Sequence, residues 1–328
     1  LRDPKLLTAI ARCQKIYQQT FWANAAALEY VQACVEYAKR GFNINELGIF
    51  LGPGGVGLSL FTAHLAAMVG AQNHRYFDPN VFYQDDEMRK IIETLIGAFL
   101  FTGQERPTGQ KNSMREDLLK KFATAEGIAG RMPYAILTKL IKLIGWKRLE
   151  MNKLFQFDGI DDSNFESIVR RCAVIIIKAR FFDEAYRTSK FGDKEACEKA
   201  GVFARDPDAM AFLTGEDGVD AGLLIQHLWG STKTLDDLRL IMSNYVKCGG
   251  DDGATNQMMR QACGLEKDAP GSSSIVTALS SNLTDALASE TSRPSSVPEG
   301  ASALLRHYVP FIINSSPGYL TNMTCTRI

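Results

Sequence analysis

The sequence has no long hydrophobic run and no net charge. Its longest apolar candidates are the short stretch Ala173–Ile177 and the interrupted stretch Ile91–Phe101, whereas a membrane helix needs about 18–20 consecutive apolar residues. We also expect no secretory signal peptide at the start of the chain. We therefore expect no membrane contact and an intracellular location, cytoplasmic or nuclear. Because the first residue is Leu1, we also expect a fragment of a longer protein.

Cysteine and histidine are too scattered for a metal centre. The seven cysteines include no pair at Cys-x-x-Cys spacing, and their number is odd, which argues against both a zinc site and a disulfide framework. Among the four histidines, His64 and His74 are ten positions apart, which is not a ligand spacing. We expect reduced thiols in a reducing compartment, and no metal beyond an ion that accompanies a phosphate ligand.

The composition is that of a globular protein. The chain has 328 residues, 45% hydrophobic and 23% charged, which fits about two domains with large cores and excludes disorder throughout. Charge is unevenly placed: residues 111–153 hold ten basic and four acidic side chains, and residues 191–300 hold nine and seventeen. A polyanion would meet the basic middle, but a solvated face balanced by the acidic tail is an equally simple explanation.

Hydrophobic periodicity indicates alternating helices and strands. Helical spacing predicts helices at residues 5–40, 59–69, 81–99, 114–122 and 133–144. Short apolar runs predict strands at residues 47–51, 99–102, 148–152 and 172–177. This alternation predicts an α/β fold with a parallel-sheet core.

The same patterns predict the domain organisation. A helical N-terminal segment, residues 1–40, precedes the α/β core. We place that core at residues 41–190 and a helical C-terminal domain at residues 191–268. The remaining residues, 269–328, combine a flexible stretch rich in Ser and Pro with a short apolar tail.

A glycine-rich loop, Gly-Pro-Gly-Gly-Val-Gly-Leu-Ser, joins the predicted strand 47–51 to the predicted helix 59–69. It matches the phosphate-loop pattern G-x-x-x-x-G-K-[ST] except that Leu58 replaces the lysine. Glycines let backbone N–H groups approach phosphate oxygens, and a helix N-terminus favours an anion. The Ser hydroxyl would ligate the Mg²⁺ of bound ATP. The candidate residues are Gly52, Gly54, Gly55, Gly57 and Ser59.

The missing lysine leaves two interpretations open. Leu58 cannot neutralise the β- and γ-phosphates of a nucleotide. The loop is therefore either a phosphate site that takes its cation from elsewhere, with Lys111, Lys120 and Lys121 as candidates, or a glycine-rich turn that only packs a helix on a sheet.

Further candidate site residues, all charged or polar, lie in or after the predicted elements that follow the glycine loop. An acid that follows a hydrophobic strand beside a phosphate loop would hold Mg²⁺ or polarise a water. The candidates, in chain order, are Glu105, Lys120, Lys121, Arg131, Asn152, Arg170 and Arg171.

This order of motifs resembles superfamily-3 helicases, in particular the primase–helicase ATPase domains of viruses, phages and plasmids, over residues 45–185. The resemblance implies an AAA+-like P-loop NTPase fold with ATP and Mg²⁺ as cofactors. It also implies a hexameric ring of identical subunits that moves 3′→5′ on single-stranded nucleic acid.

The resemblance also implies roles for the residues that match. Glu105 matches the acid that activates water and helps to hold Mg²⁺, and Asn152 matches the polar sensor. Arg170 or Arg171 matches the arginine that reaches a neighbouring subunit's nucleotide. The basic stretch that faces the nucleic acid or the phosphates is matched by Lys120, Lys121 and Arg131.

Each candidate also has a purely structural explanation. Asp85 and Asp86 are rival acids that follow a hydrophobic run, although they equally suit a helix N-terminus. Paired lysines on an amphipathic helix commonly form a solvated face, and an Asn commonly turns the chain. Arg170 and Arg171 have acidic neighbours with which they would form weak surface ion pairs; these are Asp161, Asp162 and Glu166.

Three functions are therefore compatible with the sequence. The first is a helicase-like NTPase that couples ATP hydrolysis to movement on single-stranded nucleic acid. The second is a catalytically inactive P-loop scaffold that binds nucleic acid or partners, which Leu58 favours. The third is a monomeric P-loop enzyme such as a small-molecule kinase.

Overall fold

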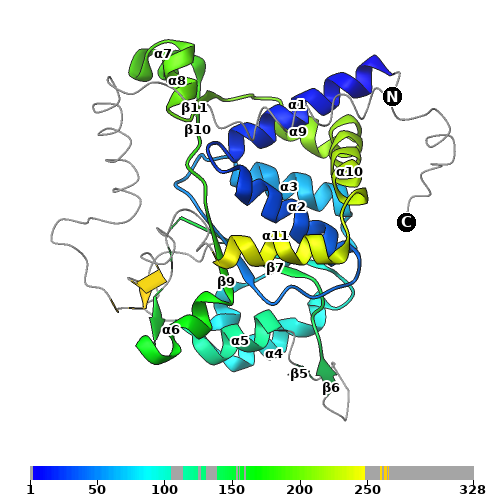
Figure 1. Ribbon diagram of the computed structural model, residues 1–328, viewed down its shortest axis with the longest axis vertical. Coiled ribbons are helices and arrows are strands. Elements are labelled where there is room, and N and C mark those ends of the chain that lie inside the picture. Colours follow the sequence, from blue (N-terminus) through cyan, green and yellow to red (C-terminus); the bar gives the residue numbers. More distant parts are fainter. Residues whose placement is uncertain are drawn as a thin grey trace.

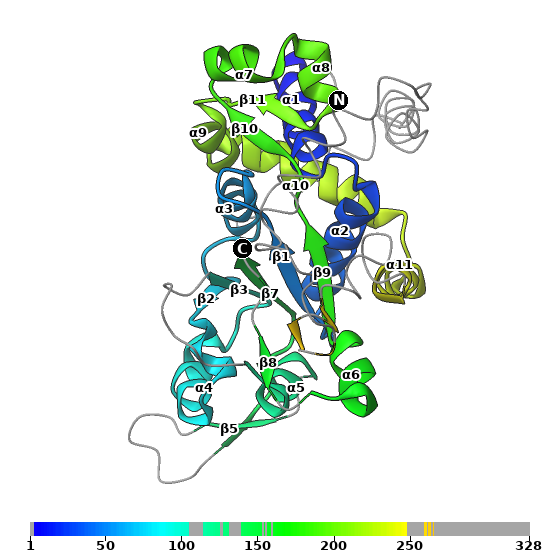
Figure 2. The same ribbon diagram turned by 90° about the vertical axis from the view of Figure 1, so that its left-hand side faces the viewer.

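The centre of the molecule is a five-stranded parallel sheet, in the order β2-β3-β7-β1-β9 (Figure 2). The computed structural model describes residues 3–104, 114–124, 127–130, 139–152, 154, 156–158, 160–247, 259, 260, 262, 263 and 265. The sheet strands are β1 (Leu47–Leu51), β2 (His74–Phe77), β3 (Leu100–Gln104), β7 (Trp146–Met151) and β9 (Cys172–Ile176). The predicted α/β fold with a parallel core is confirmed.

The central strand β1 lies between β7 and β9, with Leu47 opposite Lys147 on one side and opposite Cys172 on the other. Every residue of β1 and of β9 is buried. Strands of a parallel sheet that is covered on both faces are apolar along their whole length. This explains why residues 47–51 and 172–177 are continuous hydrophobic runs.

One face of the sheet is covered by helices that follow β2, β3 and β7 in the chain, in the lower half of Figure 1. Phe101 and Leu149 of the sheet belong to one apolar cluster with Phe82 and Phe122. Phe122 lies between Phe82 and Phe77, with ring centroids 5.2 and 4.9 Å apart. The elements on this face are η1 (Pro79–Phe82), α4 (Asp85–Ile92), η2 (Glu93–Leu95), α5 (Glu116–Thr124) and α6 (Asp162–Val169).

The opposite face packs against helices from both ends of the described chain, in the upper half of Figure 1. Phe50 and Trp146 of the sheet share a cluster with Tyr30 and Tyr245, whose rings stack at 4.6 Å. Among the residues that the structure describes, no helix is long and apolar enough to cross a bilayer. The helices of this face are α1 (Pro4–Thr20), α2 (Ala25–Lys39), α3 (Leu58–Val69), α9 (Ala209–Thr214), α10 (Glu216–Ser231) and α11 (Leu235–Lys247).

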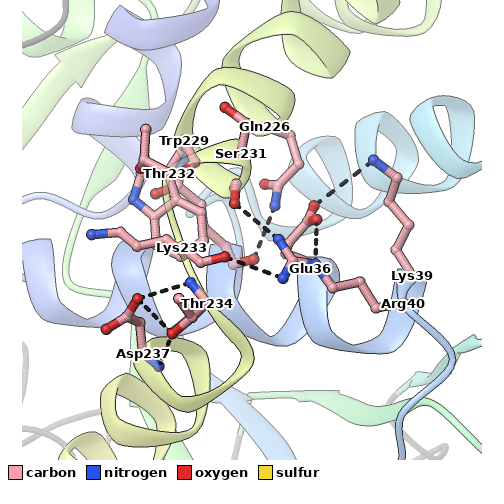
Figure 3. A network of polar contacts seen from close by, with 12 residues as sticks. Glu36, Lys39, Arg40, Gln226, Trp229, Ser231, Thr232, Lys233, Thr234 and Asp237 are labelled. Atoms are coloured by element: carbon pink, nitrogen blue, oxygen red, sulfur yellow. Dashed lines mark hydrogen bonds and ion pairs between the residues drawn. The ribbon is translucent and has the colours of Figure 1, made fainter.

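Arg40 ties α2 to the turn between α10 and α11 (Figure 3). Its guanidinium donates hydrogen bonds to the carbonyl oxygens of Gly230 at 2.9 Å and Lys233 at 3.2 Å, and to Glu36 at 2.9 Å. The last carbonyl groups of a helix have no partner within that helix. Arg40 therefore supplies donors where α10 ends.

Among the described residues, three small two-stranded sheets lie outside the central sheet. The chain leaves β9 into a unit in which β10 and β11 pair in parallel beside two short helices. Its elements are β10 (Arg180–Phe182), α7 (Glu184–Phe191), α8 (Lys194–Lys199) and β11 (Val202–Ala204). The other pairs are β4 (Met114–Arg115) with β8 (Phe157–Asp158), and β5 (Ile128–Gly130) with β6 (Lys139–Ile141).

Two predicted helices are broken in the structure. The helix expected over residues 5–40 is two helices, because Ala23 takes a positive φ of 56° and Asn24 caps α2 by accepting a hydrogen bond from the Ala27 amide at 3.0 Å. The helix expected over residues 81–99 is only the two-turn α4 with a 3-10 turn on either side.

The predicted helix 133–144 is wrong where the structure describes it. Residues 139–141 form β6, which pairs antiparallel with β5, and residues 133–138 lie outside the described chain. The predicted helix 114–122 begins later than expected, since Met114 and Arg115 form β4 before α5 starts at Glu116.

Candidate functional site

The glycine loop leads from β1 into α3 at the carboxyl edge of the sheet. Gly55 and Gly57 have positive φ values of 85° and 77°, a conformation that favours glycine. A Cβ atom placed on Gly54 or Gly55 would meet nothing within 4 Å. The loop therefore turns an exposed stretch of backbone toward open space.

The loop is anchored at its two ends. The Gly52 amide donates to the Met151 carbonyl at 3.2 Å, which ties the first glycine to the end of β7. A Cβ on Gly57 would lie 3.1 Å from the Phe181 ring of β10. Gly57 is also the N-cap of α3, and its carbonyl accepts from the Phe61 amide at 3.0 Å. The first amides of this helix have no partners within it and attract an anion.

The two residues after the last glycine point to different environments. Leu58, at the position of the expected lysine, is only 9% exposed and belongs to the apolar cluster of α2 and α3. Ser59 is exposed on the first turn of α3. The loop thus fits a phosphate group through its backbone and the serine hydroxyl, but residue 58 supplies no cation.

The carboxyl ends of two further strands meet the loop at the same edge. Asn152 is exposed and follows Met151, whose carbonyl binds Gly52. Gln104 ends β3 and lies opposite Glu150 of β7. Glu105 is the next residue along the chain and lies outside the described residues. The structure therefore brings Asn152 and the end of β3 to the edge that carries the loop.

The two arginine candidates lie at the other edge of the sheet. Arg170 and Arg171 precede β9, and the Arg171 carbonyl accepts from the amide of Leu47 at the start of β1, at 2.7 Å. Arg170 forms an exposed ion pair with Glu166 at 2.6 Å. Arg171 donates through Nη1 to the backbone carbonyl of Ser167 at 2.7 Å.

The predicted basic stretch is divided. Lys120 and Lys121 lie on α5, where Lys120 pairs with Glu116 and Lys121 pairs with Asp85 at 3.6 Å. Arg131 directly follows β5 and lies outside the described residues. These lysines are thus ion-paired on a helix face, as the structural explanation for them expects.

Sequence reasoning missed a buried polar network beneath α3. Arg148 of β7 is fully buried. Its Nη2 atom lies 3.0 Å from Glu150 and donates a hydrogen bond to the hydroxyl of Thr62 in α3. Its Nε atom donates to Thr102 of β3 at 3.1 Å, and Thr62 donates to Glu150. The network joins the helix of the glycine loop to β3 and β7.

The network extends to β2 through His74. The Nε2 atom of His74 lies 2.9 Å from the Thr102 hydroxyl. Burial, together with the nearby guanidinium groups of Arg148 and Arg75, lowers the pKa of His74 to about 4. His74 is therefore neutral in the folded protein at pH 7, so a second buried positive charge beside Arg148 is avoided.

This environment predicts an acid-sensitive fold. An unfolded histidine has a pKa of about 6.5, so protons bind the unfolded chain first as the pH falls from 7 to 4. The free energy of unfolding, which is at its full value above pH 6.5, should fall by about 2–3 kcal/mol over this interval. We expect His74→Gln to remove this part of the loss in urea unfolding at pH 7, 5.5 and 4.5. Parallel stability curves for the native and variant proteins would contradict the assignment.

No family model matches the sequence, and no curated protein matches it. Solved structures give a distant likeness. "The A form apo structure of NrS-1 C terminal region-CTR" is 12% identical, with a TM-score of 0.43, 71% of this chain and 50% of that chain covered. "The apo structure of NrS-1 C terminal region (305-718)" is 13% identical, with a TM-score of 0.38 and the same coverage.

This chain therefore spans about half the length of these two structures. At such identities and TM-scores the likeness carries no argument about this chain's chemistry.

Proposed function

We propose that this chain is an AAA+-like P-loop NTPase that binds ATP and Mg²⁺ at the glycine loop and uses hydrolysis to move on single-stranded nucleic acid. The carrying observation is that the loop, Asn152 and the end of β3 share one edge of the sheet. Ligands of open parallel sheets bind outside the carboxyl ends of the strands, where the strand order reverses. In this sheet β1 is the direct neighbour of β7 and β9, although β2 and β3 lie between β1 and β7 in the sequence.

Each residue at this edge has a defined task in the proposal. The backbone at Gly54 and Gly55 and the first amides of α3 bind phosphate oxygens. Bound ATP with Mg²⁺ supplies the phosphoanhydride bond that is cleaved. Ser59 holds the ion through its hydroxyl, Glu105 positions and polarises the attacking water, and Asn152 hydrogen-bonds the γ-phosphate.

The proposal also assigns partners to residues far from the loop. Arg170 and Arg171 lie at the amino edge of the sheet, so they suit a neighbouring subunit's nucleotide better than their own. This placement supports a ring of identical subunits. Nucleic acid would contact the exposed side of α5 at Lys120 and Lys121, and Arg131 beyond β5.

A second candidate function is an inactive P-loop scaffold. The burial of Leu58 in an apolar cluster favours it, because a leucine offers no positive charge to the phosphates. The scaffold would retain the loop and bind nucleic acid or partners without turnover.

Replacement of Ser59 tests the nucleotide site. Ser59→Ala removes one exposed hydroxyl without disturbing α3, so we expect Mg²⁺-dependent ATP binding and hydrolysis to fall more than about tenfold, equivalent to about 1.4 kcal/mol. The matched control is Ser231→Ala, an exposed serine at the end of α10. Titration with a fluorescent ATP analogue and a phosphate-release assay, with and without single-stranded DNA, give the measurements.

ATP binding and hydrolysis by the native protein distinguish the two candidate functions. ATP binding without hydrolysis, with or without single strands, selects the scaffold. If millimolar ATP and Mg²⁺ do not bind the native chain, the nucleotide site itself is rejected.

A further inference from the structure

An open groove of about 540 Å³ separates α1 from the unit formed by α7, α8 and β11. These elements lie in the upper part of Figure 1. The volume is in the range of small-molecule sites, about 300–1,000 Å³. None of its lining residues belongs to the glycine loop, so the groove is a separate feature.

Positive charge dominates the groove once its ion pairs are formed. Arg12 binds Asp206 at 2.7 Å, Arg187 binds Glu184 at 2.5 Å, and Lys194 lies 3.9 Å from Glu198. These pairs use every acidic side chain of the lining. Two basic residues of the lining, Lys15 and Arg205, make no ion pair within the part of the chain that the structure describes.

Arg187 is a buried charged residue in the lining of the groove. It is only 4% exposed, and its Nη2 atom is engaged by Glu184. Its Nε atom is buried and has no hydrogen-bond acceptor among the described residues. A buried donor without an acceptor is costly, and a planar guanidinium with a spare donor matches the oxygens of a phosphate group.

The groove is connected to the glycine loop through the paired strands β10 and β11. Arg205 donates its amide to the Phe182 carbonyl at 2.8 Å, which extends the pairing of β11 with β10. A Cβ atom on the last glycine of the loop, Gly57, would lie 3.1 Å from the ring of the neighbouring Phe181. A ligand in the groove would therefore lie beside the strand against which the glycine loop rests.

We propose that this groove is a second anion site, which binds phosphate esters through Lys15, Arg187 and Arg205. Two sources carry this chemistry, a mononucleotide and the backbone of a single-stranded oligonucleotide. Lys15 and Arg205 supply the net positive charge, and Arg187 supplies a fixed, directional donor. An acidic peptide would be attracted by the same charge, so the test includes one.

The test compares a double variant with a matched double control. Lys15→Gln/Arg205→Gln removes two charges from the groove, whereas Lys5→Gln/Lys199→Gln removes two charges from α1 and α8 outside it. We expect binding of a fluorescein-labelled 15-nucleotide oligo(dT), or of labelled thymidine monophosphate, to weaken at least tenfold in the first variant and less than about threefold in the control. Fluorescence anisotropy at low salt gives the affinities.

Two further measurements identify the ligand. For oligo(dT), the slope of log affinity against log salt concentration should flatten by about 1.4 in the groove variant, since each lost single-strand phosphate contact is worth about 0.7. Arg187→Met should weaken the preferred ligand by a similar factor, and circular dichroism melting checks its fold. Binding of thymidine monophosphate alone would identify a mononucleotide site.

Other outcomes overturn the proposal. Equal binding of the groove variant and the control, no binding of either phosphate ester, or equally tight binding of a polyglutamate peptide would each do so. Ser59→Ala should leave groove binding unchanged, so its failure and the failure of the nucleotide site are distinguishable.

Discussion

Replacing Arg148 with alanine is expected to lower the free energy of unfolding by about 3–5 kcal/mol, because it leaves a buried carboxylate without its cationic partner. Arg148 is fully buried and lies 3.0 Å from Glu150. Its guanidinium also lies 5.2 Å from the ring centroid of Phe50 and 5.6 Å from that of Trp146. Alanine would remove the charge, the hydrogen bonds to two threonines and these ring contacts together.

Two further variants make this prediction specific. Arg170→Ala breaks an exposed ion pair whose side chains are 74% and 78% accessible, so it should change stability by less than about 0.5 kcal/mol. The double change Arg148→Met/Glu150→Leu should recover much of the loss, since apolar side chains can replace a buried ion pair. Urea unfolding at pH 7 compares the three. If Arg148→Ala and Arg170→Ala unfold at the same urea concentration, the network does not stabilise the fold.

Replacing Glu105 with glutamine is expected to lower ATP hydrolysis by about 100-fold or more while nucleotide binding persists, because the amide cannot take up a proton from the attacking water. Glu105 follows Gln104 at the exposed end of β3, the strand next to β7. The rival acid Asp85 lies in the first turn of α4, 2.6 Å from Arg89 and 3.6 Å from Lys121.

Asp85→Asn is therefore the control. It should leave turnover within about twofold of the native value, because Asp85 is a surface acid at a helix N-terminus. Phosphate release is measured for both variants with saturating ATP and Mg²⁺ and a single-stranded oligonucleotide. Loss of turnover in Asp85→Asn with normal turnover in Glu105→Gln would move the acidic role to α4.

Strands β1, β3, β7 and β9 of the sheet could be predicted because their signal is local, whereas β2, with the polar sequence His-Arg-Tyr-Phe, was missed. Residues 47–51 and 172–177 are apolar without interruption, as strands buried on both faces must be. The glycine loop and the helix after it follow β1 directly, so their order in the chain fixes their contact. The helix predicted over residues 133–144 failed because the pairing of β6 with β5 overrides a local helical pattern.

The buried network and the groove depend on contacts that a single sequence does not display. Arg148 and Glu150 are two positions apart on one face of a strand, and charged residues in that pattern are normally taken to face solvent. In the groove, Arg12 and Asp206 are 194 positions apart, and no local pattern predicts that they meet.

The burial of Leu58 has a consequence for how the glycine loop would work. In this chain the first residue of α3 is an apolar anchor, so the loop takes its shape from packing against the core and from Gly52 and Gly57. No lysine ammonium group at position 58 is needed to keep the backbone of the loop in this conformation. If the loop binds an anion as proposed, this packing would preorganise the backbone before binding, and little conformational entropy would be lost.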